Sequence, residues 1–110
     1  MKKVTAGIIT DTNNKILIAQ RNKEDKLSLK WEFPGGKIKE GETPEECLKR
    51  EIREELCLDI KVGEFFEKSI YHSDSGSIEL LAYFANVLSG TTKLIVHNDV
   101  RWVDINEISK

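Results

Sequence analysis

Residues 35–58 read GGKIKEGETPEECLKREIREELCL, and this stretch decides most of what the sequence predicts. Thr43, Pro44 and Glu46 stand where an N-cap, a first helical residue and the third residue of a capping box are expected. The pattern predicts a helix that runs to about Leu56. Its buried stripe is expected to consist of three residues at helical spacing, Leu48, Ile52 and Leu56.

Three carboxylates of this helix, Glu51, Glu54 and Glu55, share an arc of about 100° on a helical wheel, beside the buried stripe. Like charges at i, i+3 and i+4 mildly destabilise a helix, so a surface helix gains nothing from grouping them. Converging carboxylates suit a hard divalent cation, Mg²⁺ or Mn²⁺, when phosphates complete its shell. A solvated face is the alternative, because Glu46–Arg50 and Arg50–Glu54 are ordinary i,i+4 pairs.

The segment before the helix favours the cation site. Gly35 and Gly36 permit a close backbone approach, and we expect the carbonyl group of Gly36 to face the same cation. Glu42 precedes the N-cap, and Arg50 comes directly before Glu51.

Strand patterns flank the helix on both sides. Residues 4–10 and 15–21 predict a hairpin around the turn chemistry of residues 11–14, and residues 22–30 predict a loop. Residues 31–36 form a short extended piece that Pro34 and the two glycines are expected to end.

After the helix, residues 60–71, 77–88, 93–96 and 100–103 read as strands. A second helix is expected to begin near Asn106 and to be cut short at Lys110. This order of elements predicts an α+β fold.

Composition predicts a single domain over residues 1–110. The chain has 17 basic and 19 acidic residues and a net charge of −2, which argues against a partner that is a nucleic-acid polymer. Its apolar runs are too short for a membrane span. Cys47 and Cys57 match neither a zinc nor a disulfide pattern, so we expect free thiols in a cytoplasmic protein. We also expect a monomer or a homodimer.

Here the residues resemble a known family. Gly36, Glu42, Arg50-Glu51 and Glu54-Glu55 match the spacing of the Nudix box, G-x5-E-x7-R-E-U-x-E-E-x-G-U with U aliphatic, over residues 36–58. The box glycine near the helix end is Cys57, which must either end the helix differently or adopt a strained left-handed conformation.

The resemblance implies the Nudix α/β/α sandwich with a mixed sheet, here with a truncated C-terminal helix. It implies Mg²⁺-dependent hydrolysis of a nucleoside triphosphate to the monophosphate and pyrophosphate. Gly36, Glu51, Glu54 and Glu55 would hold the metal, with Glu54 as the first choice for proton acceptor. Arg50 would orient the carboxylates.

The wider phrase from Glu32 to Lys37 resembles the MutT-type branch, in which Arg21 and Lys37 would face phosphate, while Gly35 and Glu42 are structural. The implied physiological substrate is an oxidised nucleotide such as 8-oxo-dGTP, in nucleotide-pool sanitising and DNA repair. The alternatives are a (d)CTP or 5-methyl-dCTP pyrophosphatase and a non-catalytic nucleotide-binding module. Relatives often carry a metal-site Glu where this chain has Val96.

The remaining candidates have plainer interpretations. We expect Cys47 to be a buried inert thiol, His72 and His97 to be structural or solvent-facing, and Trp31 and Trp102 to be core or rim anchors.

Overall fold

The computed structural model describes residues 2–22, 29–74, 76–95, 97–104 and 106. In chain order its elements are β1 (Lys2–Thr10), β2 (Ile16–Gln20), β3 (Trp31–Glu32), β4 (Gly35–Lys37), α1 (Pro44–Leu56), β5 (Asp59–Ser73), β6 (Gly76–Ser89) and β7 (Asp99–Val103). The expected C-terminal helix lies almost wholly outside the described residues, as does Val96.

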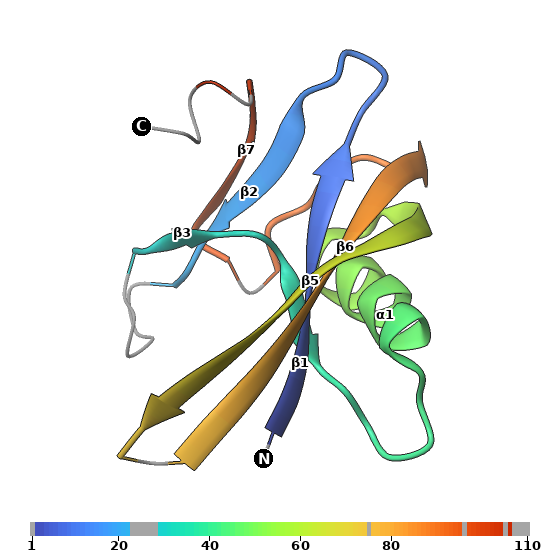
Figure 1. Ribbon diagram of the computed structural model, residues 1–110. Coiled ribbons are helices and arrows are strands. Elements are labelled where there is room, and N and C mark those ends of the chain that lie inside the picture. The colour runs from blue at the N-terminus through green and yellow to red at the C-terminus, as the bar shows by residue number, and fades with distance from the viewer. Residues whose placement is uncertain (1, 23–28, 75, 96, 105, 107–110) are drawn as a thin grey trace.

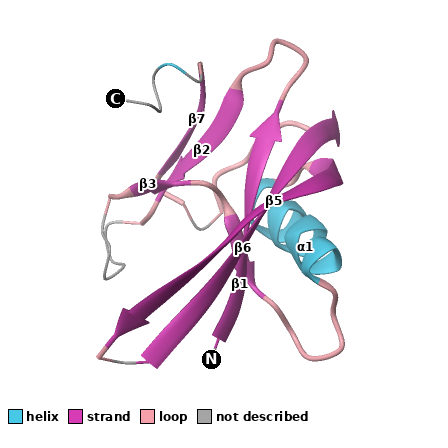
Figure 2. Cartoon of the chain, viewed as in Figure 1, coloured by secondary structure: helices cyan, strands magenta, loops and turns pink. Residues whose placement is uncertain are grey.

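The seven strands form one mixed sheet, shown in Figure 1, with α1 packed against it. β1 pairs in parallel with β6 and antiparallel with β2 and β4. β5 pairs antiparallel with β6, and both β3 and β7 pair antiparallel with β2. Figure 2 shows how the helix lies to one side of the strands. The α+β class and the mixed sheet are therefore confirmed.

The hairpin at the N-terminus is as predicted. Thr10 of β1 lies opposite Ile16 of β2. Between them the Asp11 carboxylate accepts hydrogen bonds from the backbone N–H groups of Asn13 (2.8 Å) and Lys15 (2.9 Å). An aspartate that bonds the backbone two residues on is a standard turn device, which explains why local chemistry sufficed here.

The extended piece at residues 31–36 is two strands, so this prediction was wrong in detail. β3 pairs with β2, whereas β4 pairs with β1, and the carbonyl group of Pro34 between them accepts a hydrogen bond from Gly7 N–H (2.8 Å). The glycines do not end the strand. A Cβ atom at Gly35 would overlap the carbonyl oxygen of Thr5, so the missing side chain is what lets β4 approach β1.

Helix α1 begins and ends as its sequence predicts. Thr43 Oγ1 accepts a hydrogen bond from Glu46 N–H (3.1 Å), and Glu46 Oε1 accepts one from Thr43 N–H (2.9 Å), which completes the capping box. The helix ends at Cys57 in the left-handed conformation (φ 59°, ψ 31°). Its buried residues are Cys47, Leu48, Ile52 and Leu56.

The strand expected at residues 93–96 is absent from its described part, residues 93–95. The backbone of this stretch bonds other elements instead. Lys93 N–H donates to the carbonyl oxygen of Leu56 (3.2 Å), and Asn98 N–H donates to that of Gln20 (2.9 Å). The segment thus crosses from the end of α1 to β2 and leads into β7.

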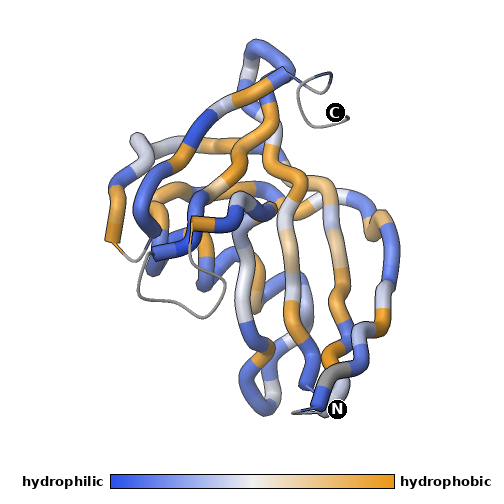
Figure 3. The backbone as a smooth tube through the Cα atoms, turned by 90° about the vertical axis from the view of Figure 1, so that its left-hand side faces the viewer, coloured by the Kyte–Doolittle hydropathy of each residue, from blue (hydrophilic) through white to orange (hydrophobic). Residues whose placement is uncertain are grey.

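The hydrophobic core lies between α1 and the sheet. Its fully buried members include Ile9 of β1, Leu17 of β2 and the buried residues of α1. Figure 3 shows hydrophobic positions along the strands, while the turns are mostly hydrophilic. Within the described residues no helix is long and apolar enough to cross a membrane.

Candidate functional site

A cavity of about 1030 Å³ opens between residues 4–6 of β1, strand β4 and the side of α1 that carries Glu51 and Glu55. Ligand pockets in proteins commonly have volumes of about 300–1,000 Å³, so this cavity has the size of a small-molecule site. Its apolar lining residues include Val4, Ala6, Ile18, Phe33, Leu80 and Val103. Its ionisable lining residues are Arg21, Glu32, Lys37, Glu51, Glu55, His97 and Arg101.

Two carboxyl groups of α1, those of Glu51 and Glu55, line this cavity side by side. Their side chains are 14% and 24% exposed. Burial, followed by a hydrogen bond with Glu51 and the charge of Glu51, raises the pKa of Glu55 to about 8. Two carboxylates confined together cannot both ionise cheaply without a cation, so this pair has the electrostatics of a cation site.

Gly36 lies against this pair because it has no side chain. A Cβ atom there would overlap the carboxyl group of Glu51. The carbonyl oxygen of Gly36 accepts hydrogen bonds from Thr5 Oγ1 (3.2 Å) and Cys47 Sγ (3.5 Å). Gly36 therefore allows β4 to lie close to the Glu51 carboxyl group. Contact of the Gly36 carbonyl group with a metal stays a prediction.

Arg50 joins the carboxylates of the motif. Its Nε and Nη2 donate to the two oxygens of Glu42 (2.7 and 3.0 Å), and its Nη1 donates to Glu51 (2.9 Å) and Glu54 (3.3 Å). The Arg50 hydrogen bonds hold the pKa of Glu42 down at about 2. A two-point contact of this kind orients both partners, and the roles of Arg50 and Glu42 in the working site stay predictions.

Glu54 lies apart from the other two helix carboxylates. Its side chain is 55% exposed, it does not line the cavity, and it bonds Arg50. The geometry thus brings Glu51 and Glu55 together and leaves Glu54 at the rim. This placement weakens the sequence-based choice of Glu54 as proton acceptor.

The two cations predicted to face phosphate both line the cavity. Lys37 is exposed at its edge. Arg21 donates from Nη1 to both carboxylate oxygens of Glu32 (2.8 and 3.0 Å), so its charge is partly balanced by a carboxylate of the same wall. Sequence reasoning missed this pair, since Arg21 follows β2 whereas Glu32 belongs to β3.

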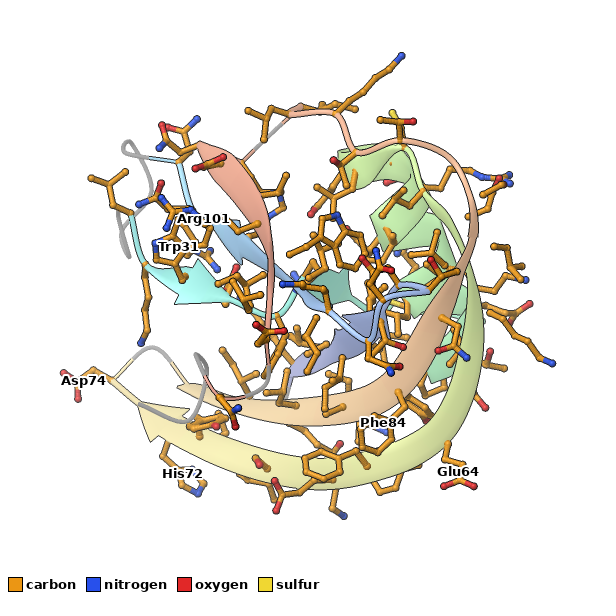
Figure 4. All side chains as sticks on the ribbon, turned by 90° about the horizontal axis from the view of Figure 1, so that it is seen from above. Trp31, Glu64, His72, Asp74, Phe84 and Arg101 are labelled. Carbon is orange, nitrogen blue, oxygen red and sulfur yellow. The ribbon has the colours of Figure 1, made fainter. Side chains whose placement is uncertain are left out.

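Trp31 and Arg101 form the outer end of the cavity wall. The Arg101 guanidinium lies over the Trp31 indole, 4.9 Å from the ring centroid, and Figure 4 shows the two side chains together at the β3–β7 end. Trp31 is therefore a rim residue, as expected. Trp102 packs against the hydrophobic core.

Two of the plainer interpretations agree with the structure. Cys47 is buried, and burial raises the pKa of its thiol, which keeps it protonated and unreactive. His72 is exposed on the outer side of β5 (Figure 4), where its Nδ1 lies 2.7 Å from Ser77 Oγ.

His97 is the functional candidate that sequence reasoning did not single out. Its side chain is 8% exposed, it lines the cavity, and its Nε2 lies 3.8 Å from Oε2 of Glu55. The contact joins residues far apart in the chain, and no local pattern around His97 announces it.

The described side chains fit a magnesium-type cation better than a structural metal. They include no cluster of three or more His, Cys, Asp or Glu residues with metal-site geometry. Mg²⁺ is usually held by one or two carboxylates together with substrate phosphates and water, not by an all-protein cage. The Glu51–Glu55 pair beside an open cavity matches that mode.

Comparison with known proteins agrees with this geometry. The NUDIX domain profile matches residues 1–110 of the chain. The chain belongs to the NUDIX domain family. The 8-oxo-dGTP diphosphatase of Escherichia coli (strain K12) is 42% identical over 82 residues, which cover 73% of this chain and 64% of that protein. The CTP pyrophosphohydrolase of the same strain is 34% identical over 107 residues, which cover 97% and 78%.

The fold of this NUDIX domain is that of solved relatives. A MutT protein from Methanosarcina mazei Go1 superposes with a TM-score of 0.88 at 20% identity, over 97% of this chain and 79% of that one. The Nudix resemblance and the fold that it implied are thus confirmed. The chain spans about half to two thirds of the length of several 8-oxo-dGTP diphosphatases that it matches.

Proposed function

We propose that this NUDIX domain is a Mg²⁺-dependent nucleoside triphosphate pyrophosphohydrolase, which releases a nucleoside monophosphate and pyrophosphate. The observation that carries the proposal is the Glu51–Glu55 pair, two neighbouring, mostly buried carboxyl groups on the wall of a nucleotide-sized cavity. Family membership and the complete set of box carboxylates support it.

The residues of the site divide the work by their position. Glu51 and Glu55 would hold the cation, which when bound neutralises phosphate charge and lowers the pKa of a coordinated water. Arg50 keeps Glu51 in place, and Gly36 leaves room for it. Lys37 and Arg21 lie where they can contact the phosphates, with Glu32 steering the direction of Arg21.

An oxidised nucleotide such as 8-oxo-dGTP is the leading substrate, because several 8-oxo-dGTP diphosphatases are among the relatives. A (d)CTP or 5-methyl-dCTP pyrophosphatase is the second candidate. It is favoured by the CTP pyrophosphohydrolase relative, whose similarity extends over 97% of this chain. Nucleotide-pool sanitising is the cellular role that we propose for the first candidate.

Pyrophosphate release from 8-oxo-dGTP, dGTP, dCTP and 5-methyl-dCTP, measured with Mg²⁺, tests the proposal and ranks the substrates. We expect turnover of at least one of them at a kcat/KM of about 10⁴ M⁻¹s⁻¹ or more, the lower end for ordinary enzymes. A protein that binds these nucleotides without releasing pyrophosphate would instead be the non-catalytic nucleotide-binding module.

A further inference from the structure

Arg50 forms hydrogen bonds with three of the four glutamates of the Nudix box, and Glu55 is the fourth. Arg50 donates hydrogen bonds to Glu42, Glu51 and Glu54. No such bond from Arg50 to Glu55 is present among the described residues, although burial disfavours the ionised form of Glu55. An ionised, half-buried carboxylate needs hydrogen-bond donors. A group other than Arg50 must therefore donate to the Glu55 carboxylate when Glu55 holds a cation.

One described basic side chain, that of His97, lies close to the Glu55 carboxyl group. Its Nε2 lies 3.8 Å from Oε2 of Glu55. This separation is longer than a hydrogen bond, whose heavy atoms are about 2.7–3.2 Å apart. A side-chain shift of about 1 Å closes it, a small movement for a glutamate that has three rotatable bonds.

The surroundings of the ring decide which nitrogen carries the proton. Nδ1 of His97 is buried and has no hydrogen-bond partner among the described residues. A proton on Nδ1 would be a buried donor without an acceptor, whereas a proton on Nε2 faces the oxygen of Glu55. These contacts favour the tautomer that carries its proton on Nε2, on the side of the ring that faces Glu55.

We infer that His97 is a positioning residue for Glu55, whose Nε2–H group donates to the Glu55 carboxylate and holds it in the orientation that binds the cation. His97 does for Glu55 what Arg50 does for Glu51. The inference rests on the proposed function in one respect only, that Glu55 is a cation ligand. Outer hydrogen-bond partners of metal ligands commonly contribute about 10- to 100-fold to metal affinity.

Metal affinity in a matched pair of variants tests this inference. The side chains of Gln and Met have similar length and volume, but only Gln places an N–H group near the position of Nε2. With Mn²⁺ alone as the probe, free ion counted by electron paramagnetic resonance, we expect His97→Met to weaken binding about 10- to 100-fold. His97→Gln should stay within about 3-fold of the wild type. His72→Met, on the outer side of β5, is the control and should change nothing.

Two outcomes of this experiment contradict the inference. If His97→Met binds Mn²⁺ as tightly as the wild type, the imidazole does not act on Glu55. If His97→Gln is as weak as His97→Met, the ring contributes packing and not a hydrogen-bond donor. Thermal unfolding of both variants shows whether each is folded.

Nitrogen-15 NMR of the wild-type imidazoles adds a test that needs no substitution. We expect the His97 ring to carry its proton on Nε2, and we expect the Nε2 signal to move when Mg²⁺ is added. A proton on Nδ1 would overturn the inference.

Separate measurements keep this inference distinct from the proposed function. If the wild type binds Mn²⁺ and His97→Met does not, but no nucleoside triphosphate is hydrolysed, the proposed function fails and the inference stands. If the wild type binds no Mn²⁺, both fail.

Discussion

The backbone of Gly36 lies against the carboxyl group of Glu51, so closely that a Cβ atom at position 36 would overlap the Glu51 side chain. The glycine and the glutamate are 15 positions apart in the sequence and belong to β4 and α1. Their contact brings a strand and a helix together at the cation site.

Replacing Gly36 with Ala should therefore displace the Glu51 carboxyl group. We expect a fall in kcat of about 10²-fold, the scale of a 1 Å misplacement in an active site, together with weaker Mg²⁺ activation. Gly63→Ala in β5 is the matched control, because its Cβ atom would meet only the carbonyl group of Phe84, whose oxygen lies at 3.3 Å. Equal kinetics in the two variants would show that the contact has no catalytic role.

The two neighbouring glutamates at the helix end should differ in importance. Glu55 lines the cavity, whereas Glu54 is 55% exposed and bonds Arg50. We predict that Glu55→Gln lowers turnover by at least about 10²-fold and weakens Mn²⁺ binding. Glu54→Gln should cost less in turnover and leave Mn²⁺ affinity nearly unchanged. The reverse order would restore Glu54 as the proton acceptor.

Stability at acid pH should depend on the pair formed by Glu42 and Arg50. The Arg50 hydrogen bonds lower the pKa of Glu42 from 4.5 to about 2 in the folded protein. A carboxyl group whose pKa is lower in the folded than in the unfolded protein stabilises the fold. This stabilisation is complete above the pKa of the unfolded state and is lost as the pH falls toward the pKa of the folded state. The pair should thus weaken between about pH 5 and pH 2.

Urea unfolding as a function of pH measures this effect, and Glu42→Gln is the variant to compare. The stability difference between wild type and variant should shrink as the pH falls through that window. A difference that is constant from pH 7 to pH 2 would show that the ionised form of Glu42 contributes nothing.

Cys57 ends α1 in a left-handed conformation (φ 59°), where the family motif has glycine. A residue with a side chain destabilises the folded state by about 1–2 kcal/mol in this conformation. Glycine removes that strain, but part of the gain is lost because glycine has more conformational entropy in the unfolded chain. We expect Cys57→Gly to raise the free energy of unfolding by about 0.5–1 kcal/mol. Cys57→Ala keeps the left-handed penalty and should give no such gain.

Local chemistry predicted the parts of this fold whose partners lie nearby in the sequence. The capping box of Thr43 and Glu46, the turn at Asp11 and the strained end at Cys57 all follow from neighbouring residues. Pairings between distant segments did not follow. The separation of β3 from β4 depends on which strand each one meets.

The candidate site divides in the same way. The spacing of the box identified Gly36, Arg50 and Glu51 from the sequence, because α1 and the strand before it, β4, carry them. The placement of Glu54 at the rim depends on packing against the sheet. His97 joins the site only because the segment after β6 crosses from α1 to β2, which no periodicity in that segment reveals.

The products of nucleoside triphosphate hydrolysis, measured with and without Mg²⁺, test the central claim most directly. The wild type should form nucleoside monophosphate and pyrophosphate in equal amounts, only with the divalent ion present. The Glu51→Gln/Glu55→Gln double variant should lose at least about 10²-fold in rate. Release of inorganic phosphate in place of pyrophosphate, or a double variant as active as the wild type, would contradict the account.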